Sequence, residues 1–222
     1  MRVRHAIVTV LAAAVVTVAA PPTSTAAEIT VFCSTPLRHV MAALIPEFER
    51  ATNHRVLITY GASPELKEKI ESGAQFDLVV LTPAFLDGLI KERRVIPASR
   101  MPIARVGVAI AIRAGAPKPD ISTADALKKT LLSAKSIGYS TGPSGLYMLT
   151  VFEKLGIADQ VKGKLKQTPS GVFVGSLIAN GDTEVGFQQI SELVHFPGID
   201  YVGPLPGGLQ RMTMFSTGIH SG

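Results

Sequence analysis

The sequence predicts a two-lobed α/β protein in which each lobe is a mostly parallel sheet flanked by helices. Short apolar runs alternate with amphipathic segments along the chain, which is the pattern of βαβ units. A longer apolar run at 103–112 is long enough to pass from one lobe into the other, and a second set of alternating elements follows it. Two such assemblies joined by a strand imply a cleft between two lobes.

The first residues have the layout of a secretory signal peptide. Arg2 and Arg4 precede an apolar stretch at 6–20, and prolines and small residues follow it. That stretch is shorter than the roughly 20 apolar residues of a bilayer span. We expect residues 1–27 to be a signal peptide cleaved near Ala26 or Ala27, with the rest exported to the periplasm. An uncleaved membrane anchor is the alternative.

Composition excludes several classes of protein. Removing Arg2 and Arg4 lowers the formal net charge from +5 to +3, there is no Trp, and no Lys/Arg block is interleaved with aromatic residues. We therefore expect no nucleic-acid partner. Cys33 is the single cysteine, so no internal disulfide forms. The histidines show no metal-ligand spacing, and we expect neither a metal nor a cofactor.

The elements of the first lobe follow from apolar periodicity. Strands are expected at 29–33, 55–60 and 77–81, and helices at 37–48 and 64–72 with a further helix starting at Pro83. Pro46 lies inside the first helical pattern. It should kink or split that helix, because an interior proline costs about 3 kcal/mol.

The pattern restarts after Pro97. After the strand at 103–112 we expect a helix capped by Ser122 or Thr123 and ending near 134. The remaining elements are a strand at 136–139, a loop at 140–145, a helix to about 155, a helix near 171–180, a strand at 184–188 and returning strands at 199–204 and 211–217. We place lobe 1 at 28–104, completed by 205–222, and lobe 2 at 105–204.

Three Ser/Thr-Pro steps follow the first three strands directly. They are Ser34-Thr35-Pro36, Ser63-Pro64 and Thr82-Pro83. A hydroxyl at the N-cap accepts a backbone N–H, and proline fits the first turn of a helix. If the strands are parallel neighbours, these helix N-termini converge on one edge, which suits an anion. Capping alone would also explain each step.

Five segments, taken in order, resemble the periplasmic molybdate-binding proteins. They are Ile29–Leu37, Tyr60–Leu66, Gly73–Val80, Pro119–Thr123 and Gly142–Tyr147. The resemblance implies the type II periplasmic-binding-protein fold and a solute receptor of an ABC importer. In that family two lobes close on an oxyanion held by neutral hydrogen-bond donors, and a permease in the inner membrane receives it.

The resemblance carries over unevenly to the binding residues. The second-loop serine falls on Ser63, the first-loop serine falls on Pro36, and the tyrosine that donates to the oxyanion falls on Gln189. The resulting candidate ligand-binding residues are Ser34, Thr35, Gly61, Ser63, Ser144, Gly171 and Gln189. The departures at Pro36 and Gln189 imply altered or broadened specificity. We expect a small anion, either a molybdate-like oxyanion or an organic acid.

Two other classes of function stay open. An exported hydrolase would use a Ser or Cys nucleophile, but the sequence around Ser144 lacks the second glycine of a nucleophile elbow, since position 146 is leucine. Cys33 lies in a predicted strand and is more typical of a small buried hydrophobe. We expect no enzyme activity. A non-transport envelope interaction module is the third class.

The end of the chain shows no helical pattern after the last returning strand. Members of the family resembled usually add C-terminal helices that pack on the first lobe, and we expect these helices to be missing here. We expect a partly exposed apolar face on lobe 1 and a monomer or weak dimer formed through that face.

Overall fold

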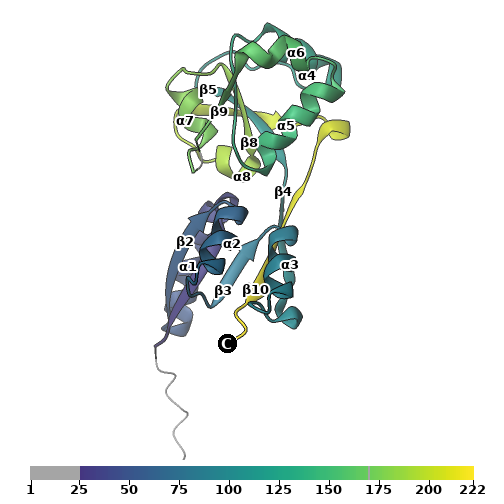
Figure 1. Ribbon diagram of the computed structural model, residues 1–222. Coiled ribbons are helices and arrows are strands. Elements are labelled where there is room, and N and C mark those ends of the chain that lie inside the picture. Colours follow the sequence, from purple (N-terminus) through teal and green to yellow (C-terminus); the bar gives the residue numbers. More distant parts are fainter. Residues whose placement is uncertain (1–25, 170) are drawn as a thin grey trace, which may run out of the picture.

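The protein consists of two five-stranded mixed sheets, each with helices on both faces (Figure 1). The structure is a computed structural model that describes residues 26–169 and 171–222. Residues 1–25, which hold most of the expected signal peptide, lie outside the described residues. We call the part built on the first sheet lobe 1 and the part built on the second sheet lobe 2. The two-lobed α/β fold expected from the sequence is confirmed. The sheets are mixed rather than mostly parallel, because two of the four strand pairings in each sheet are antiparallel.

The sheet of lobe 1 has the strand order β2-β1-β3-β10-β4. Its strands are β1 (Glu28–Ser34), β2 (Arg55–Gly61), β3 (Leu78–Leu81), β4 (Met101–Val106) and β10 (Thr213–Ile219). Strand β1 pairs in parallel with β2 and β3, whereas β10 runs antiparallel to β3 and β4. The carboxyl ends of β1, β2 and β3 therefore meet at the edge of the sheet that faces lobe 2 (Figure 1).

The helices of lobe 1 cover its two faces unequally. They are η1 (Thr35–Leu37), α1 (Arg38–Thr52), α2 (Ser63–Glu71), α3 (Pro83–Lys91) and the 3₁₀ turn η2 (Pro97–Ser99). Alternation along β1 sends Phe32 into a core with Leu66 of α2 and Leu86 of α3. Cys33 points to the opposite face, where α1 contributes Met41.

The sheet of lobe 2 has the order β7-β6-β8-β5-β9. Its strands are β5 (Val108–Arg113), β6 (Ile137–Tyr139), β7 (Leu165–Gln167), β8 (Val185–Gln189) and β9 (Ile199–Pro204). Its helices are α4 (Ala124–Ser133), α5 (Pro143–Lys154), α6 (Ala158–Val161), α7 (Val174–Ala179) and α8 (Ile190–Leu193), with 3₁₀ turns η3 (Lys162–Lys164) and η4 (Gly207–Leu209). Strand β6 is parallel to β7 and β8, so their carboxyl ends share one edge.

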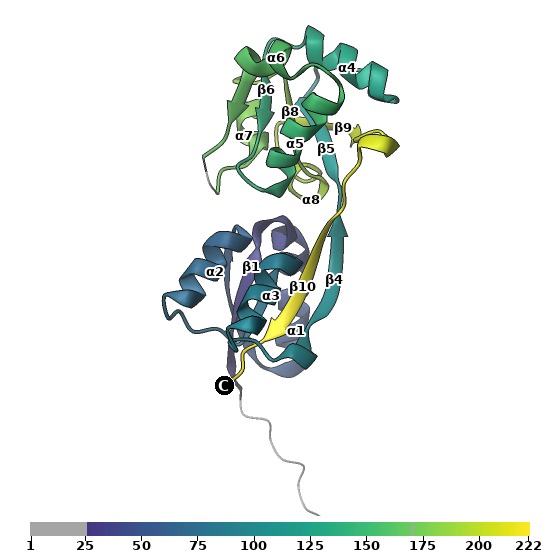
Figure 2. The same ribbon diagram turned by 45° about the vertical axis from the view of Figure 1, so that its right-hand side comes forward.

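The chain crosses between the lobes twice. The run at 103–112, expected as one strand, is two strands in different sheets, with Gly107 between β4 and β5. The chain returns through residues 205–212 to β10, which lies beside β4 (Figure 2). Gln210 holds this crossing, because its Oε1 accepts from the Val108 N–H (2.8 Å) and its Nε2 donates to the Val108 carbonyl (2.9 Å).

The expected hydroxyl caps at the three Ser/Thr-Pro steps are wrong. No side-chain cap bond forms at the start of η1, α2 or α3, and the N-cap of α2 is Ala62, with Ser63 already inside the helix. The reason is tertiary: Ser34 and Ser63 bond to each other and to neighbouring backbone groups at the sheet edge. The cap expected in lobe 2 is confirmed, since Thr123 accepts from the Ala126 N–H (3.1 Å).

Helix α1 runs through Pro46 without splitting. This stretch of the helix lies at the surface, where the backbone carbonyl that proline leaves unpaired is accessible to solvent. No side chain of α1 is buried, and Val40, Leu44 and Phe48 are 49%, 53% and 40% exposed. An apolar face on lobe 1 is therefore open to solvent. Within residues 26–169 and 171–222, no helix is long and apolar enough to cross a membrane.

Candidate functional site

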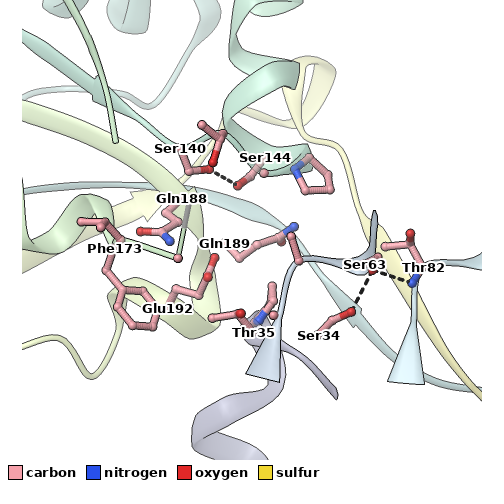
Figure 3. A pocket seen from close by; sticks show the side chains of 18 of the residues that line it. Ser34, Thr35, Ser63, Thr82, Ser140, Ser144, Phe173, Gln188, Gln189 and Glu192 are labelled. Atoms are coloured by element: carbon pink, nitrogen blue, oxygen red, sulfur yellow. Dashed lines mark hydrogen bonds between the residues drawn. The ribbon is translucent and has the colours of Figure 1, made fainter. Parts of the chain in front are cut away.

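A cavity of about 70 Å³ lies between the two lobes (Figure 3). This volume is several times the ~10–15 Å³ that one water requires, so a small solute fits. Its walls come from loops at the carboxyl ends of strands in both sheets. The lining residues are Ser34, Thr35, Pro36, Gly61, Ala62, Ser63 and Thr82 with Phe215 from lobe 1, and Ser140, Thr141, Gly142, Pro143, Ser144, Gly171, Val172, Phe173, Gln188, Gln189 and Glu192 from lobe 2.

The lobe 1 wall is a closed chain of hydrogen bonds. The Thr82 N–H donates to Ser63 Oγ (3.1 Å), and Ser63 Oγ lies 2.8 Å from Ser34 Oγ. Ser34 Oγ donates to the Val80 carbonyl (3.0 Å), which can only accept. Ser34 therefore accepts the Ser63 proton, and both hydroxyl protons are engaged inside lobe 1. Figure 3 shows the contacts of Ser63 with Ser34 and Thr82.

The lobe 2 wall contains hydroxyls that have no strong partner among the described residues. Ser140 and Ser144 are buried, but their Oγ atoms are 3.4 Å apart, beyond the usual O–H···O range of about 2.5–3.0 Å. Gly145 allows this approach of loop and helix, because a Cβ there would lie 1.9 Å from the Ser140 carbonyl oxygen. Ser144 is in the first turn of α5, where backbone N–H groups have no partner within the helix.

A buried carboxyl group faces the same cavity. Glu192, in the short helix α8, is only 6% exposed. Burial raises the pKa of Glu192 to about 7, although the Gln189 backbone N–H and the Gln188 side chain both donate to the carboxylate and oppose this rise. Gln188 is oriented by the Val174 N–H, which donates to its Oε1 (2.7 Å). A carboxyl group of this kind exchanges its proton near neutral pH.

Gln189 lines the cavity, but its amide is held by the crossing strands. In the orientation that satisfies both ends of the amide, Nε2 donates to the Val106 (3.1 Å) and Gly107 (3.2 Å) carbonyls, and Oε1 accepts from Thr213 Oγ1 (2.9 Å). The side chain therefore ties the end of β8 to both crossings.

The remaining candidates from the sequence also lie at the cavity. Thr35, Gly61 and Gly171 are among its lining residues. The Pro36 carbonyl accepts a hydrogen bond from Ser191 Oγ (2.6 Å), which joins η1 of lobe 1 to α8 of lobe 2. All seven candidate residues are thus brought to one place.

Comparison with known proteins assigns the family. The sequence pattern described as bacterial extracellular solute-binding protein matches residues 29–222. The chain belongs to this family.

The individual proteins that this chain resembles include an enzyme and binding proteins. An aconitate isomerase from Pseudomonas sp. is 34% identical over 204 residues, which cover 89% of this chain and 76% of that protein. A molybdate-binding protein from Azotobacter vinelandii is 29% identical over 173 residues (76% of this chain, 67% of that protein). The solved periplasmic molybdate-binding protein of the same organism superposes with a TM-score of 0.71 at 20% identity, covering 87% of this chain and 85% of that chain. The resemblance to periplasmic molybdate-binding proteins is confirmed.

Several polar groups that line the interlobe cavity were not predicted from the sequence. Ser140, Gln188 and Glu192 contribute polar atoms that the sequence did not single out, and Thr82 was noted at a helix start but not as a candidate ligand-binding residue. One signal was available for Glu192: it is the third residue of a helix that follows a strand, where a carboxylate accepts the N-cap N–H. Nothing in the sequence alone indicated that this carboxyl would be buried.

The nucleophiles considered for a hydrolase lack activation. Cys33 is fully buried, and burial raises the pKa of its thiol to about 12, so the thiolate does not form near neutral pH. Ser144 lies in the cavity, but no histidine or lysine is among the described lining residues. The described wall therefore offers Glu192 as its one titratable side chain.

Proposed function

We propose that this family member captures a small anion in the cavity between its lobes and delivers it to an ABC permease. The observation that carries the proposal is the composition of the wall: hydroxyls, amides and the N-termini of α2, α3 and α5, with no cationic side chain among the described lining residues. Such a wall attracts negative charge through aligned N–H dipoles and O–H groups.

Neutral donors must replace the water that the anion loses. Each unmatched oxygen in a dry site is unfavourable, so several donors have to converge. Ser144 and the N-terminus of α5 supply donors from lobe 2, and Ser63 supplies one from lobe 1 if Ser34 turns its own proton toward Ser63. Thr35, Gly61 and Gly171 complete the wall, and Gln189 positions the crossing strands.

Glu192 acts in this proposal as a protonated donor. With a pKa of about 7, its carboxyl group is largely neutral in mildly acidic solution and donates a hydrogen bond to an anion. When it ionises it repels the ligand. The ligand class is either an oxyanion, as the names of the molybdate-binding relatives indicate, or an organic acid.

Export and the permease complete the proposal. The family is extracellular, and the sequence of residues 1–27 is typical of a signal peptide. We propose a periplasmic receptor whose lobes close on the ligand by movement at the crossings near Gly107 and Thr213.

Calorimetry tests the binding role. The chain from Glu28 onward is titrated at pH 6 with molybdate, tungstate, sulfate, phosphate and small carboxylates. We expect saturable heat from at least one class, and loss of most of that heat in Ser144→Ala combined with Glu192→Ala. Absence of heat from every anion at millimolar concentration would refute anion capture.

A second function is favoured by Glu192 and by the relative named aconitate isomerase. A carboxyl group whose pKa lies near the working pH is suited to general acid–base catalysis. In an unsaturated tricarboxylate such as aconitate, the Glu192 carboxylate would remove a proton from the methylene carbon next to the double bond. The double bond then shifts by one carbon, and the same proton, or one from solvent, is added at the former vinylic carbon. No co-reactant is required.

Proton magnetic resonance in D₂O separates this function from simple capture. The protein is incubated with cis-aconitate, and conversion and deuterium uptake are followed. Under the isomerase proposal, Glu192→Gln abolishes both and still binds the ligand, because glutamine keeps the hydrogen bonds of the neutral acid. A wild-type protein that binds cis-aconitate without converting it eliminates the isomerase and leaves the receptor.

A further inference from the structure

A second cavity of about 340 Å³ lies beside the first. The two share part of their walls: Ala62 at the start of α2, and the loop and first turn before α5 at Thr141, Gly142 and Pro143. The other lining residues of the second cavity are Pro64, Phe85, Leu146, Tyr147, Thr150 and Arg211. Space for the remainder of a ligand longer than a compact ion therefore lies next to the first site.

Arg211 is the one charged side chain in the described walls of the two cavities besides Glu192. Its guanidinium carbon lies 5.2 Å from the centre of the Tyr147 ring, a cation–π distance. The Tyr147 hydroxyl donates to the Leu209 carbonyl (2.9 Å), which fixes the ring. The backbone N–H of Arg211 donates to Gln210 Oε1 (3.0 Å), and the same oxygen accepts from the Val108 N–H. Arg211 is thus held by a backbone hydrogen bond and by the contact of its guanidinium with the Tyr147 ring.

No acidic side chain compensates this positive charge. Among the described residues, neither Arg211 nor Lys154, whose ammonium lies 5.8 Å from the centre of the same tyrosine ring, forms a salt bridge. Two cations on one aromatic ring, at the wall of a cavity with no carboxylate of its own, create a local positive potential. That potential favours an anionic group in the second cavity.

We propose that the second cavity is a subsite for an additional carboxylate, and that the ligand is a di- or tricarboxylic acid with one carboxylate among the neutral donors of the first cavity and another at Arg211. This inference rests on the proposed function and names its ligand class. Phe85, Pro64 and Leu146 give the intervening wall an apolar character that matches a carbon skeleton. A compact tetrahedral oxyanion fills the first cavity alone and gains nothing from Arg211.

The two parts of the site differ in what they select. Neutral donors and a protonated Glu192 accept one negative group of limited size. The guanidinium pairs with a planar carboxylate through two parallel N–H···O bonds, a geometry that lysine does not reproduce. The distance between the two parts would then discriminate polycarboxylates from acids with a single carboxylate.

Calorimetry at pH 6 with two probes tests the inference. The probes are propane-1,2,3-tricarboxylate, which has no double bond and is not isomerised, and molybdate as a compact anion. Arg211→Gln is expected to weaken tricarboxylate binding about tenfold, because a partly exposed charge-assisted bond is lost, and to leave molybdate binding unchanged. Arg211→Lys should recover only part of the affinity.

Arg105→Gln is the matched control. Arg105 is an exposed residue of the crossing strand β4 and lines neither cavity, so this variant removes the same charge without touching the subsite. We expect it to bind both probes as the wild type does. Both substituted side chains are exposed, and melting temperatures check that each variant is folded.

The outcomes separate the two proposals. If molybdate or another compact anion binds but the tricarboxylate binds no more tightly, or if Arg211→Gln and Arg105→Gln weaken it equally, the subsite is overturned while anion capture stands. If no anion binds to the wild type, the proposed function fails and the subsite fails with it.

Discussion

The two walls of the interlobe cavity satisfy their polar groups to different degrees. In lobe 1, Ser34, Ser63 and Thr82 form a continuous set of hydrogen bonds that ends on a backbone carbonyl. In lobe 2, Ser140 and Ser144 are buried but only weakly paired, and Glu192 is buried with a pKa raised to about 7. The buried hydroxyls of the lobe 1 wall are therefore paired, whereas those of the lobe 2 wall have no strong partner among the described residues.

The difference in hydrogen bonding between the two walls suggests different roles for the lobes in ligand binding. A hydrogen-bonded wall keeps its shape whether or not a ligand is present, so under the proposed function lobe 1 provides a fixed surface against which the ligand is positioned. Buried polar groups without strong partners carry an unfavourable free energy that a ligand relieves on binding. Under the proposed function, lobe 2 therefore supplies most of the favourable free energy of ligand binding and the pH dependence of that binding.

The largest expected effect concerns the pH dependence of folding stability. A pKa of about 7 in the folded protein, against the ordinary 4.5, corresponds to about 3 kcal/mol. The folded state holds this proton more tightly, so the stabilisation is complete below pH ~4.5 and is lost as pH rises through about 7. Glu192→Gln should remove this loss and make the protein more stable than the wild type at pH 8, as measured by urea unfolding at several pH values.

A carboxylate outside the cavity provides the control for this experiment. Glu68 is exposed on α2, and Glu68→Gln should leave the pH profile of stability unchanged. The free energies of unfolding of Glu192→Gln and the wild type could instead change in parallel from pH 5 to 8. That result would show that Glu192 does not have a raised pKa, and it would remove the main difference between the two walls.

The next effect tests whether the lobe 1 wall is as complete as its geometry indicates. Ser63→Ala removes the acceptor of the Thr82 N–H and the donor to Ser34 Oγ together. Leaving buried groups unpaired should lower the free energy of unfolding by about 2 kcal/mol. Ser72→Ala, at an exposed hydroxyl just after the same helix, should change it by less than about 0.5 kcal/mol. Equal effects of the two substitutions would show that the wall contributes no stability.

The fold could be read from the sequence where apolar spacing decides the outcome. The alternation around Phe32 and Cys33 places one residue on each face of β1, and the observed cores contain them in that way. The break at Gly107 could not be read, because an apolar run looks the same whether it lies in one sheet or two. The apolar spacing of α1 was visible, but the exposure of Leu44 depends on what else covers lobe 1.

The candidate residues chosen from strand-end loops line one cavity, but the hydrogen-bond partners of several of them were not predicted. Ser34 and Ser63 look like helix caps in sequence, and the caps are replaced by contacts between segments that are distant along the chain. Gln189 looks like a group facing a ligand, and its amide is instead bonded to the crossing strands. Local sequence patterns predict the element and the loop in which a residue lies. Its hydrogen-bond partners are fixed by the packing of the two sheets.

A smaller effect concerns affinity rather than stability. If the anion binds only when Glu192 is protonated, its dissociation constant should rise about tenfold for each pH unit above 7 and be nearly constant below pH 6. Calorimetry with a ligand whose own charge does not change in this range, such as sulfate, measures this slope. Glu192→Gln should flatten it. An equally steep slope in that variant would place the titrating group elsewhere.

The smallest expected change in the free energy of unfolding is that of Ser144→Ala. It contrasts with the larger loss expected for Ser63→Ala. The Ser144 Oγ lies 3.4 Å from Ser140, too far for a strong bond, so Ser144→Ala should alter the free energy of unfolding by less than about 0.5 kcal/mol. The same substitution should still weaken anion binding several-fold, because the hydroxyl is available to the ligand while the backbone donors of α5 stay in place. Unfolding and calorimetry on Ser63→Ala and Ser144→Ala together decide the matter. A Ser144 variant that loses as much stability as the Ser63 variant would mean that the lobe 2 wall is already satisfied without a ligand, and that the two lobes share the work of binding equally.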